Sequence, residues 1–335
     1  MLNNICAYML NNSNAQKLNK MYLTLINRYF LKMIVEKLCN FLYNKLCKIV
    51  MNMLNKKLNK QEEMGMSYII SYHVGKGGVG KTTLSYNGAY YLAEKKVAKV
   101  CIIDQDESCS MSSRFISEEE IETIEEKHTV RSIYKGKNPE PIKVDENIDL
   151  IVGASTLSEL ANEVKDGQGR WTMLNWYFKY QDELSKYDYI LIDTHNSFDI
   201  FVDNALVISD KVVAITDVDV DAIKKLQKEV EHVERLKKTI INPATRESFV
   251  NAEVIKVGNK IPNQSADDKS FREKIESIMA VDPSFYGYFE KRVDLATTKT
   301  SGLPITKMEE KNYQTKKEFY DTTYKIFDKI FEVKV

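Results

Sequence analysis

One short stretch of this sequence combines clustered glycines with side chains that bind phosphate and metal ions. It reads Gly75-Lys76-Gly77-Gly78-Val79-Gly80-Lys81-Thr82-Thr83, and it holds four of the thirteen glycines in the chain. Glycine lets successive backbone N–H groups turn toward one anion, at dihedral angles that a side chain would forbid. A lysine and two hydroxyl groups directly after the glycines suit a phosphate chain and a Mg²⁺ ion. The stretch therefore predicts a loop that surrounds a phosphate group.

The residues on either side predict the strand and the helix that must position this loop. The apolar run Tyr68–Tyr72 reads as a buried strand, and the apolar spacing over Leu84–Leu92 suits a helix. Strand, glycine loop and helix are the order of elements that a P-loop nucleotide site requires. The expected contacts with ATP and Mg²⁺ are the backbone of Gly77, Gly78, Val79 and Gly80 around the phosphates, Lys81 on the β- and γ-phosphates, Thr82 on Mg²⁺ and Thr83 on the α-phosphate.

Three carboxylates follow predicted strands. Asp104 and Asp106 come after the run Val97–Ile103, and Asp193 ends the strand that begins at Tyr187. In open α/β sheets, ligands bind at the carboxyl ends of the strands. We therefore expect these carboxylates to lie beside the phosphate loop, where Asp193 can hold Mg²⁺ through water.

The phosphate loop resembles that of one known family. The segment from Lys76 to Thr83 is similar to the deviant phosphate loop of the ParA/MinD ATPases, in which a second, signature lysine lies near the start of the loop. Lys76 occupies that place. The resemblance implies that Lys76 crosses the interface of an ATP-bound homodimer and contacts the phosphates of the partner.

The carboxylates extend this resemblance. Asp104 and Asp106 resemble the Asp-x-Asp of switch I, which implies that Asp104 supports the Mg²⁺ shell and that Asp106 orients the attacking water. The strand that ends in Asp193 resembles the Walker B strand, which implies a further contribution to the Mg²⁺ site. Two departures concern hydrolysis, because Glu107-Ser108 stands where the family usually has Pro-Gln, and His195-Asn196 stands where it commonly has two prolines. We therefore expect that the movement of the switch loop, or the hydrolysis of ATP beside it, can differ from the family pattern.

The C-terminal part carries less specific candidates. In relatives, the loop after the strand that corresponds to Val254–Asn259 contacts adenine, so the resemblance makes Asn259 a candidate adenine contact. Relatives also place basic residues in this part of the chain, which makes Arg292, Lys299 and Lys307 candidates for DNA contacts. The alternative is that each of these three is an ordinary surface charge.

The first 66 residues differ in composition from the rest. They contain ten basic and three acidic side chains, a net charge of +7, which leaves 38 basic and 45 acidic side chains and a net charge of −7 for residues 67–335. We expect this extension, residues 1–66, to be dispensable or absent from the natural product. The alternative is a basic helical appendage that binds a membrane surface or nucleic acid. Because no uncharged apolar run of about 18 residues occurs, we expect neither a signal peptide nor a transmembrane helix.

Strands alternate with helices through residues 67–335. Further apolar runs at Ile148–Ala154, Lys211–Asp217 and Phe285–Arg292 predict strands, and a final helix is predicted over Tyr313–Phe331. This alternation predicts an α/β fold of the P-loop NTPase type, with a mostly parallel, doubly wound sheet flanked by helices. Since no Gly-, Ser- or Pro-rich linker divides residues 67–335, we expect them to form one domain.

The resemblance implies an ATPase that partitions plasmid DNA, with ATP and Mg²⁺ as cofactors. The ATP-bound homodimer would bind DNA without sequence preference, and a ParB-like centromere-binding protein would stimulate hydrolysis that is weak without it. We expect a cytoplasmic, nucleoid-associated protein with no membrane partner. Two alternatives stay open. The basic extension leaves room for a MinD-like membrane-associated positioning ATPase, and the two departures in the switch segments leave room for a nucleotide-switched DNA-binding regulator with negligible hydrolysis.

Overall fold

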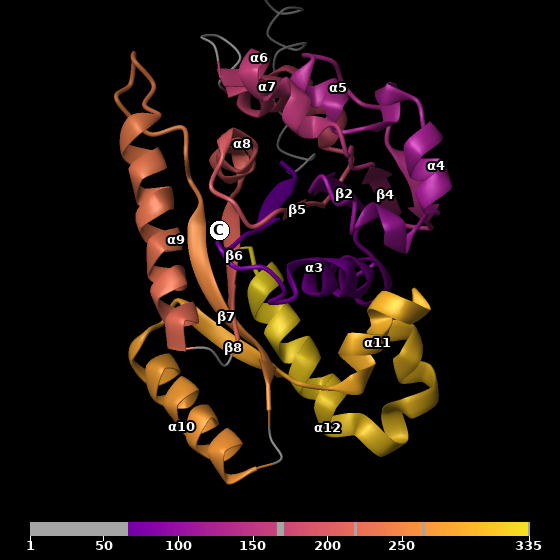
Figure 1. Cartoon of the computed structure of the whole chain (residues 1–335), viewed down its shortest axis with the longest axis vertical. Coiled ribbons are helices and arrows are strands. Elements are labelled where there is room, and N and C mark those ends of the chain that lie inside the picture. The colour runs from indigo at the N-terminus through magenta and orange to yellow at the C-terminus, as the bar shows by residue number, and fades with distance from the viewer. Residues whose placement is uncertain (1–65, 166–170, 218–219, 263–264, 334–335) are drawn as a thin grey trace, which may run out of the picture. The chain divides into compact units, whose positions relative to one another are not determined.

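The computed structural model of this chain describes residues 66–165, 171–217, 220–262 and 265–333 (Figure 1). The predicted N-terminal extension, residues 1–66, lies outside this part of the chain except for Met66. Its two interpretations therefore stay predictions. Among the described residues, no helix is both long enough and apolar enough to cross a membrane.

An eight-stranded sheet forms the centre of residues 66–333, with the strand order β3-β4-β2-β5-β1-β6-β7-β8. Its strands are β1 (Tyr68–Tyr72), β2 (Val100–Gln105), β3 (Ile142–Asp145), β4 (Ile148–Ile151), β5 (Tyr189–Thr194), β6 (Lys211–Thr216), β7 (Glu253–Ile261) and β8 (Phe285–Glu290). All neighbouring pairs are parallel except β3 and β4, which are antiparallel. The predicted mostly parallel sheet is therefore confirmed.

Helices cover both faces of this sheet (Figure 1). They are α3 (Lys81–Tyr90), α4 (Glu118–Thr123), α5 (Arg131–Tyr134), α6 (Ala161–Lys165), α7 (Thr172–Leu184), α8 (Ile200–Ile208), α9 (Val220–Thr239), α10 (Ala266–Val281), α11 (Val293–Ser301) and α12 (Ile305–Phe331). A π-helical turn, Tyr91–Lys95, continues α3. The doubly wound architecture expected from the sequence is present.

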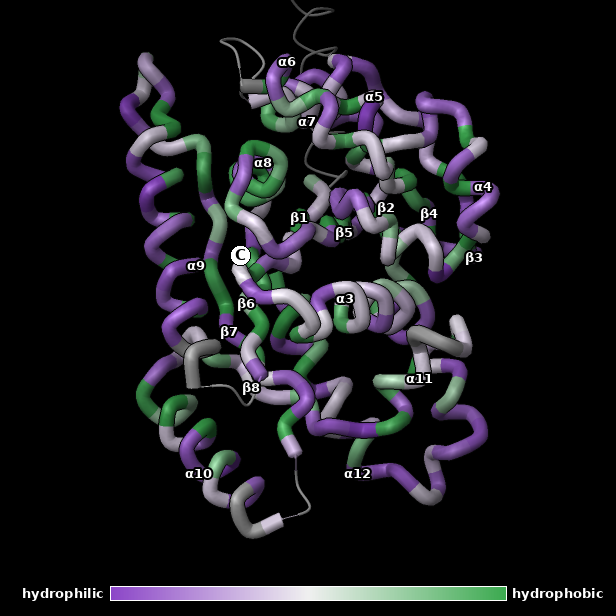
Figure 2. The backbone as a smooth tube through the Cα atoms, viewed as in Figure 1, coloured by the Kyte–Doolittle hydropathy of each residue, from purple (hydrophilic) through white to green (hydrophobic). Residues whose placement is uncertain are grey.

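The core consists of two hydrophobic clusters, because side chains alternate between the two faces of each strand. In β1, Ile70 belongs to the cluster that contains Leu84 of α3 and Phe327 of α12. The neighbouring Ile69 belongs to the other cluster, with Phe201 of α8. Figure 2 shows hydrophobic residues along the central strands and around α8, and a largely hydrophilic outer side of α9. Burial on both faces explains why β1, β2 and β6 read as continuous apolar runs rather than alternating ones.

The differences from the prediction include the start of one strand and the presence of another. The strand predicted from Val97 begins at Val100 as β2, since Val97 adopts a left-handed backbone with φ of 56° that does not fit a strand. Strand β3 was not predicted. It pairs with β4 through the tight connection at residues 146–147, and its four residues are too few to give a periodic signal.

Candidate functional site

The predicted phosphate loop connects the end of β1 to the start of α3. Gly78 and Gly80 have φ values of 75° and 101°, in the left-handed region that favours glycine. An added Cβ at Gly80 would also lie 2.3 Å from Nδ2 of Asn259, so that buried side chain would have to shift. Lys81 is the first residue of α3, so the loop delivers its backbone N–H groups at a helix N-terminus. This end of a helix attracts anions.

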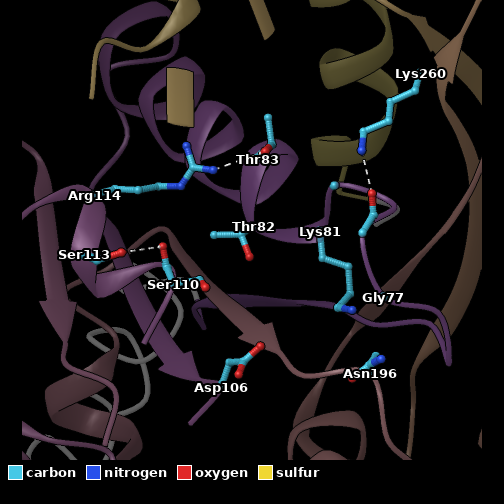
Figure 3. Close-up of a pocket in the computed structure, with 12 residues that line it drawn as sticks. Gly77, Lys81, Thr82, Thr83, Asp106, Ser110, Ser113, Arg114, Asn196 and Lys260 are labelled. Atoms are coloured by element: carbon cyan, nitrogen blue, oxygen red, sulfur yellow. Dashed lines mark hydrogen bonds between the residues drawn. The ribbon is translucent and has the colours of Figure 1, made fainter. Parts of the chain in front are cut away.

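The loop forms one wall of a pocket of about 430 Å³ (Figure 3). The residues that line the pocket are Gly77, Gly78, Gly80, Lys81, Thr82, Thr83, Asp106, Ser110, Ser113, Arg114, Asn196 and Lys260. Three of these side chains, Lys81, Arg114 and Lys260, are basic, and one, Asp106, is acidic. Figure 3 shows Arg114 and Lys260 on opposite sides of the pocket. A largely polar pocket with an excess of positive charge suits a polyanion such as a phosphate chain.

Lys81 is the buried cation of this pocket. Its exposed fraction is 9%, and Nζ donates to the Lys76 carbonyl at 3.5 Å. Burial lowers the pKa of the Lys81 ammonium, an effect that the charges of Asp193 and Asp106 oppose. An anion in the pocket would favour the charged form of Lys81 further.

Thr82 and Asp193 together form the part of the site that can hold a metal ion. The Thr82 hydroxyl donates to Oδ2 of Asp193 at 2.7 Å, while the buried Oδ1 of Asp193 has no hydrogen-bond partner among the described residues. Asp104 of β2 lies beside Asp193 of β5 in the strand register. A hydroxyl and carboxylate oxygens are the ligands that Mg²⁺ prefers, so these residues fit that ion. The described residues contain no cluster of three or more His, Cys, Asp or Glu ligands, and a Mg²⁺ ion held mainly by water and phosphates needs none.

Both buried carboxyl groups have a raised pKa. Burial raises the pKa of Asp193 to about 8, and the nearby charge of Asp104 adds to this effect. Burial raises the pKa of Asp104 to about 6, although the backbone N–H and hydroxyl of Ser112 donate to its Oδ2 at 2.8 and 2.7 Å. A divalent cation would stabilise the ionised form of both groups.

The segment after β2 brings Asp106 into the pocket. Its backbone N–H donates to Oδ1 of Asp104 at 3.2 Å, and its own Oδ1 accepts from the N–H of Ser108 at 2.9 Å. In Figure 3 the side chains of Lys81, Thr82 and Asp106 converge on one space. The structure therefore brings Lys81, Thr82, Asp104, Asp106 and Asp193 together, while the role given to each stays a prediction.

Lys76, the signature lysine, does not line the pocket in this single chain. Its Nζ lies 2.5 Å from Oδ1 of Asp217, directly after β6. The two side chains are 17% and 20% exposed. In this single chain Lys76 forms an ion pair within its own chain, and its contact with a partner subunit stays a prediction.

The predicted adenine contact, Asn259, packs against the loop itself. It is 4% exposed, and its Nδ2 donates to the Val79 carbonyl at 2.7 Å. Its neighbour Lys260 lines the pocket instead and donates from Nζ to the Gly78 carbonyl at 2.5 Å. No pattern in the sequence indicated Lys260 separately, because its position depends on the irregular end of β7.

Two of the three candidate DNA contacts, Arg292 and Lys307, do not line the pocket. Arg292 donates to Glu290 Oε2 at 2.7 Å, with its guanidinium over the Phe319 ring, and Lys307 pairs with Asp145 at 3.1 Å. Lys299 belongs to α11, and its side chain lies outside the described residues. Their predicted role stays untested.

Four further residues line the pocket but were not predicted as site residues. They are Ser110, Ser113, Arg114 and Asn196. Asn196 was noted only as a departure from the family pattern, and the two serines carry no motif. Arg114 reaches the pocket because a 3₁₀ turn, Ser112–Arg114, directs the chain back toward α3. A turn of this kind leaves no periodic pattern in the sequence.

Comparison with known proteins identifies relatives of this arrangement. The family model described as AAA domain, AAA_31, matches residues 67–246. An uncharacterised protein of Methanocaldococcus jannaschii, MJECL24, is 26% identical over 253 residues, which are 73% of this chain and 92% of that protein.

Two solved structures have the same fold. A plasmid partition protein of Borrelia burgdorferi B31, described as putative and bound to AMPPNP, is 25% identical with a TM-score of 0.60, over 79% of this chain and 98% of that one. The pNOB8 ParA bound to nonspecific DNA is 20% identical with a TM-score of 0.54, over 78% of this chain and 97% of that one.

Proposed function

Because the chain belongs to the AAA domain family AAA_31 and has the fold of the ParA/MinD-type P-loop ATPases, we propose that it is an ATPase for DNA partition. The observation that carries this proposal is that Lys81 and Thr82 line one pocket at a helix N-terminus, where the Thr82 hydroxyl is hydrogen-bonded to the buried Asp193. The AMPPNP in the Borrelia relative supports a nucleotide in the same place.

ATP hydrolysis at such a site needs little covalent chemistry from the protein. When Mg²⁺ is bound, it neutralises charge on the phosphate oxygens. Lys81 and the loop N–H groups would hold the phosphates. Thr82 and Asp193 would hold the metal with the support of Asp104, and Asp106 would orient the attacking water. Asp106 can contact a water molecule in the pocket because it lines the pocket, whereas its neighbour Asp104 is fully buried.

The ATP-bound form is a homodimer in this proposal. Lys76 leaves Asp217 and contacts the phosphates across the interface, so the dimer is stable only while the γ-phosphate is present. Hydrolysis removes that contact and returns the chain to the monomer. A ParB-like centromere-binding protein accelerates this step.

The dimer binds DNA without sequence preference, as the pNOB8 relative with nonspecific DNA supports. Contacts to phosphates come from lysines and arginines, for which Arg292, Lys299 and Lys307 are the candidates. Since residues 67–335 carry a net charge of −7, DNA binding needs a local basic surface rather than an overall positive charge.

Fluorescence anisotropy of two unrelated DNA duplexes tests this proposal. The full-length chain is titrated with Mg²⁺ and either AMPPNP or ADP, at low and at high salt. We expect binding with AMPPNP only, equal for both duplexes and lost steeply with salt, since each neutralised phosphate releases counterions. DNA binding that is equal with ADP and AMPPNP, or that prefers one sequence, would contradict the proposal.

A further inference from the structure

Arg114 enters the pocket from the segment that follows the predicted switch I carboxylates. Its Nη2 donates to Oγ1 of Thr83 at 3.1 Å (Figure 3). Its guanidinium carbon lies 4.9 Å from the centre of the Tyr86 ring. Thr83 and Tyr86 are one turn apart on α3, so they fix the guanidinium on one side of that helix. Arg114 is therefore held in place before any ligand binds.

The remaining donors of Arg114 are unsatisfied. Nε and Nη1 are buried and have no hydrogen-bond partner among the described residues, and no carboxylate there forms an ion pair with the guanidinium. Burial lowers the pKa of the Arg114 guanidinium, and the charge of Asp193 opposes this effect. The two N–H groups that have lost water without gaining a partner remain costly. A planar guanidinium with two available donors matches an oxyanion such as phosphate in geometry and in charge.

The neighbours of Arg114 indicate which part of a nucleotide it would meet. Its partner Thr83 lies in the first turn of α3, after Lys81 and Thr82, where the α-phosphate is expected. Lys260, the other basic group at the rim, already donates to the Gly78 carbonyl on the far side of the pocket. Arg114 is thus the cation next to the α-phosphate end.

We propose that Arg114 binds the α-phosphate of the nucleotide and thereby fastens the switch I segment to it. This inference rests on the proposed nucleotide site. Ser112, in the same 3₁₀ turn, holds Asp104 through its N–H and its hydroxyl. The contact of Arg114 with the nucleotide therefore also fixes the turn that positions the buried carboxylate beside the metal site.

Isothermal titration of the full-length chain with AMPPNP and with ADP, both with Mg²⁺, tests the proposal. The variants are Arg114→Gln, Arg114→Lys and the matched control Arg131→Gln. Arg131 is 15% exposed and makes ion pairs with Glu126 and Glu159, and it is not among the residues lining the pocket. The melting temperature of each variant without nucleotide reports any purely structural effect.

We expect Arg114→Gln to lower the affinities for AMPPNP and ADP by the same factor, roughly ten- to a hundredfold, because both nucleotides carry the α-phosphate. Arg114→Lys should lower them less, since the ammonium keeps the positive charge but not the two-donor geometry of the guanidinium. Arg131→Gln should leave both affinities unchanged.

Three results would overturn the proposal. Affinities of Arg114→Gln within about twofold of the wild type, with only the melting temperature lowered, would show a structural role alone. Weakening of AMPPNP but not ADP would assign Arg114 to the γ-phosphate. If the wild-type chain binds neither nucleotide, the proposed function itself is contradicted. The titration of the wild type separates this outcome from the first two, in which the wild type binds. If Arg114→Gln does not fold, the test rests on Arg114→Lys. Replacing a planar guanidinium by an ammonium at a phosphate contact should still lower the affinities for both nucleotides.

Discussion

The Thr82 hydroxyl and the Asp193 carboxylate are joined by a hydrogen bond of 2.7 Å. Thr82 lies at the start of α3 and Asp193 near the end of β5, so this bond connects the phosphate loop to the central strand of the sheet. The second oxygen of Asp193 is buried without a hydrogen-bond partner among the described residues. The pair can therefore accept a metal ion without breaking another contact of that oxygen.

Thr82→Ala and Asp193→Asn should each weaken the effect of Mg²⁺ on nucleotide affinity. In the wild type, we expect AMPPNP to bind more tightly with Mg²⁺ than with EDTA, and each change should reduce this advantage by roughly tenfold or more, since loss of a group that supports a metal site costs about ten- to a hundredfold in metal affinity. Titration with and without Mg²⁺ measures this ratio. The control is Thr123→Ala, which changes an exposed threonine of α4 and should leave the ratio of the two affinities unchanged. A variant at Thr82 or Asp193 with the wild-type ratio would argue against this metal site.

The stability of the nucleotide-free chain should fall as pH rises from 6 to 8, and Asp193→Asn should reduce that fall. The pKa of Asp193 is raised from 3.8 to about 8 on folding, so the folded state binds more protons than the unfolded state between these values. The stabilisation is complete below about pH 4 and is lost as pH rises through about 8. Urea unfolding without Mg²⁺ should show that the wild type loses about 2 kcal/mol more than Asp193→Asn between pH 6 and 8. Parallel curves for the two proteins would mean that Asp193 is ionised throughout.

Asp217→Asn should favour the ATP-bound dimer. The change removes the carboxylate that holds Lys76 within its own chain at 2.5 Å, so Lys76 moves to a partner at lower cost. Because the pair is partly exposed, we expect its loss to contribute no more than about 1 kcal/mol in each subunit, so the dimer dissociation constant should fall by no more than roughly thirtyfold when both subunits carry the change. Analytical ultracentrifugation with AMPPNP measures the constant. Lys76→Ala should prevent the dimer, and a dimer of unchanged stability in Lys76→Ala would exclude the signature role of this lysine.

Lys211 should be a major contributor to the stability of the fold. It is fully buried at the start of β6, and its Nζ donates to the carbonyls of Ile330 and Glu332 at 2.7 and 3.0 Å, at the end of α12. Lys211→Met leaves these carbonyls without their donor, so the free energy of unfolding should fall by about 2–3 kcal/mol. Lys256→Met, which removes a partly exposed pair with Asp282, should cost only about 0–1 kcal/mol. Equal losses in the two variants in urea unfolding would contradict this assignment.

The fold and the centre of the site could be predicted because their signals are contiguous in the sequence. The segment from Gly75 to Thr83 carries its chemistry in nine successive positions, and Asp104 and Asp193 each follow an apolar strand. The structure confirms the mostly parallel sheet and brings these residues together.

Residues whose position depends on irregular backbone could not be predicted in the same way. Arg114 meets Thr83 across 31 positions through a 3₁₀ turn, and Lys260 adopts a left-handed backbone with φ of 57° at the end of β7. Strand β3 has only four residues, and it forms because β4 offers a free edge. Such features depend on tertiary contacts rather than on local periodicity.

ATP hydrolysis by the full-length chain, with and without nonspecific DNA, tests the central claim most directly. We expect slow turnover that DNA raises, and we expect both Lys81→Ala and Lys76→Ala to abolish it. The first variant loses the buried cation of the phosphate pocket, and the second loses the contact across the dimer. Turnover that DNA does not change, or that persists in Lys81→Ala, would contradict an ATPase for DNA partition at this site.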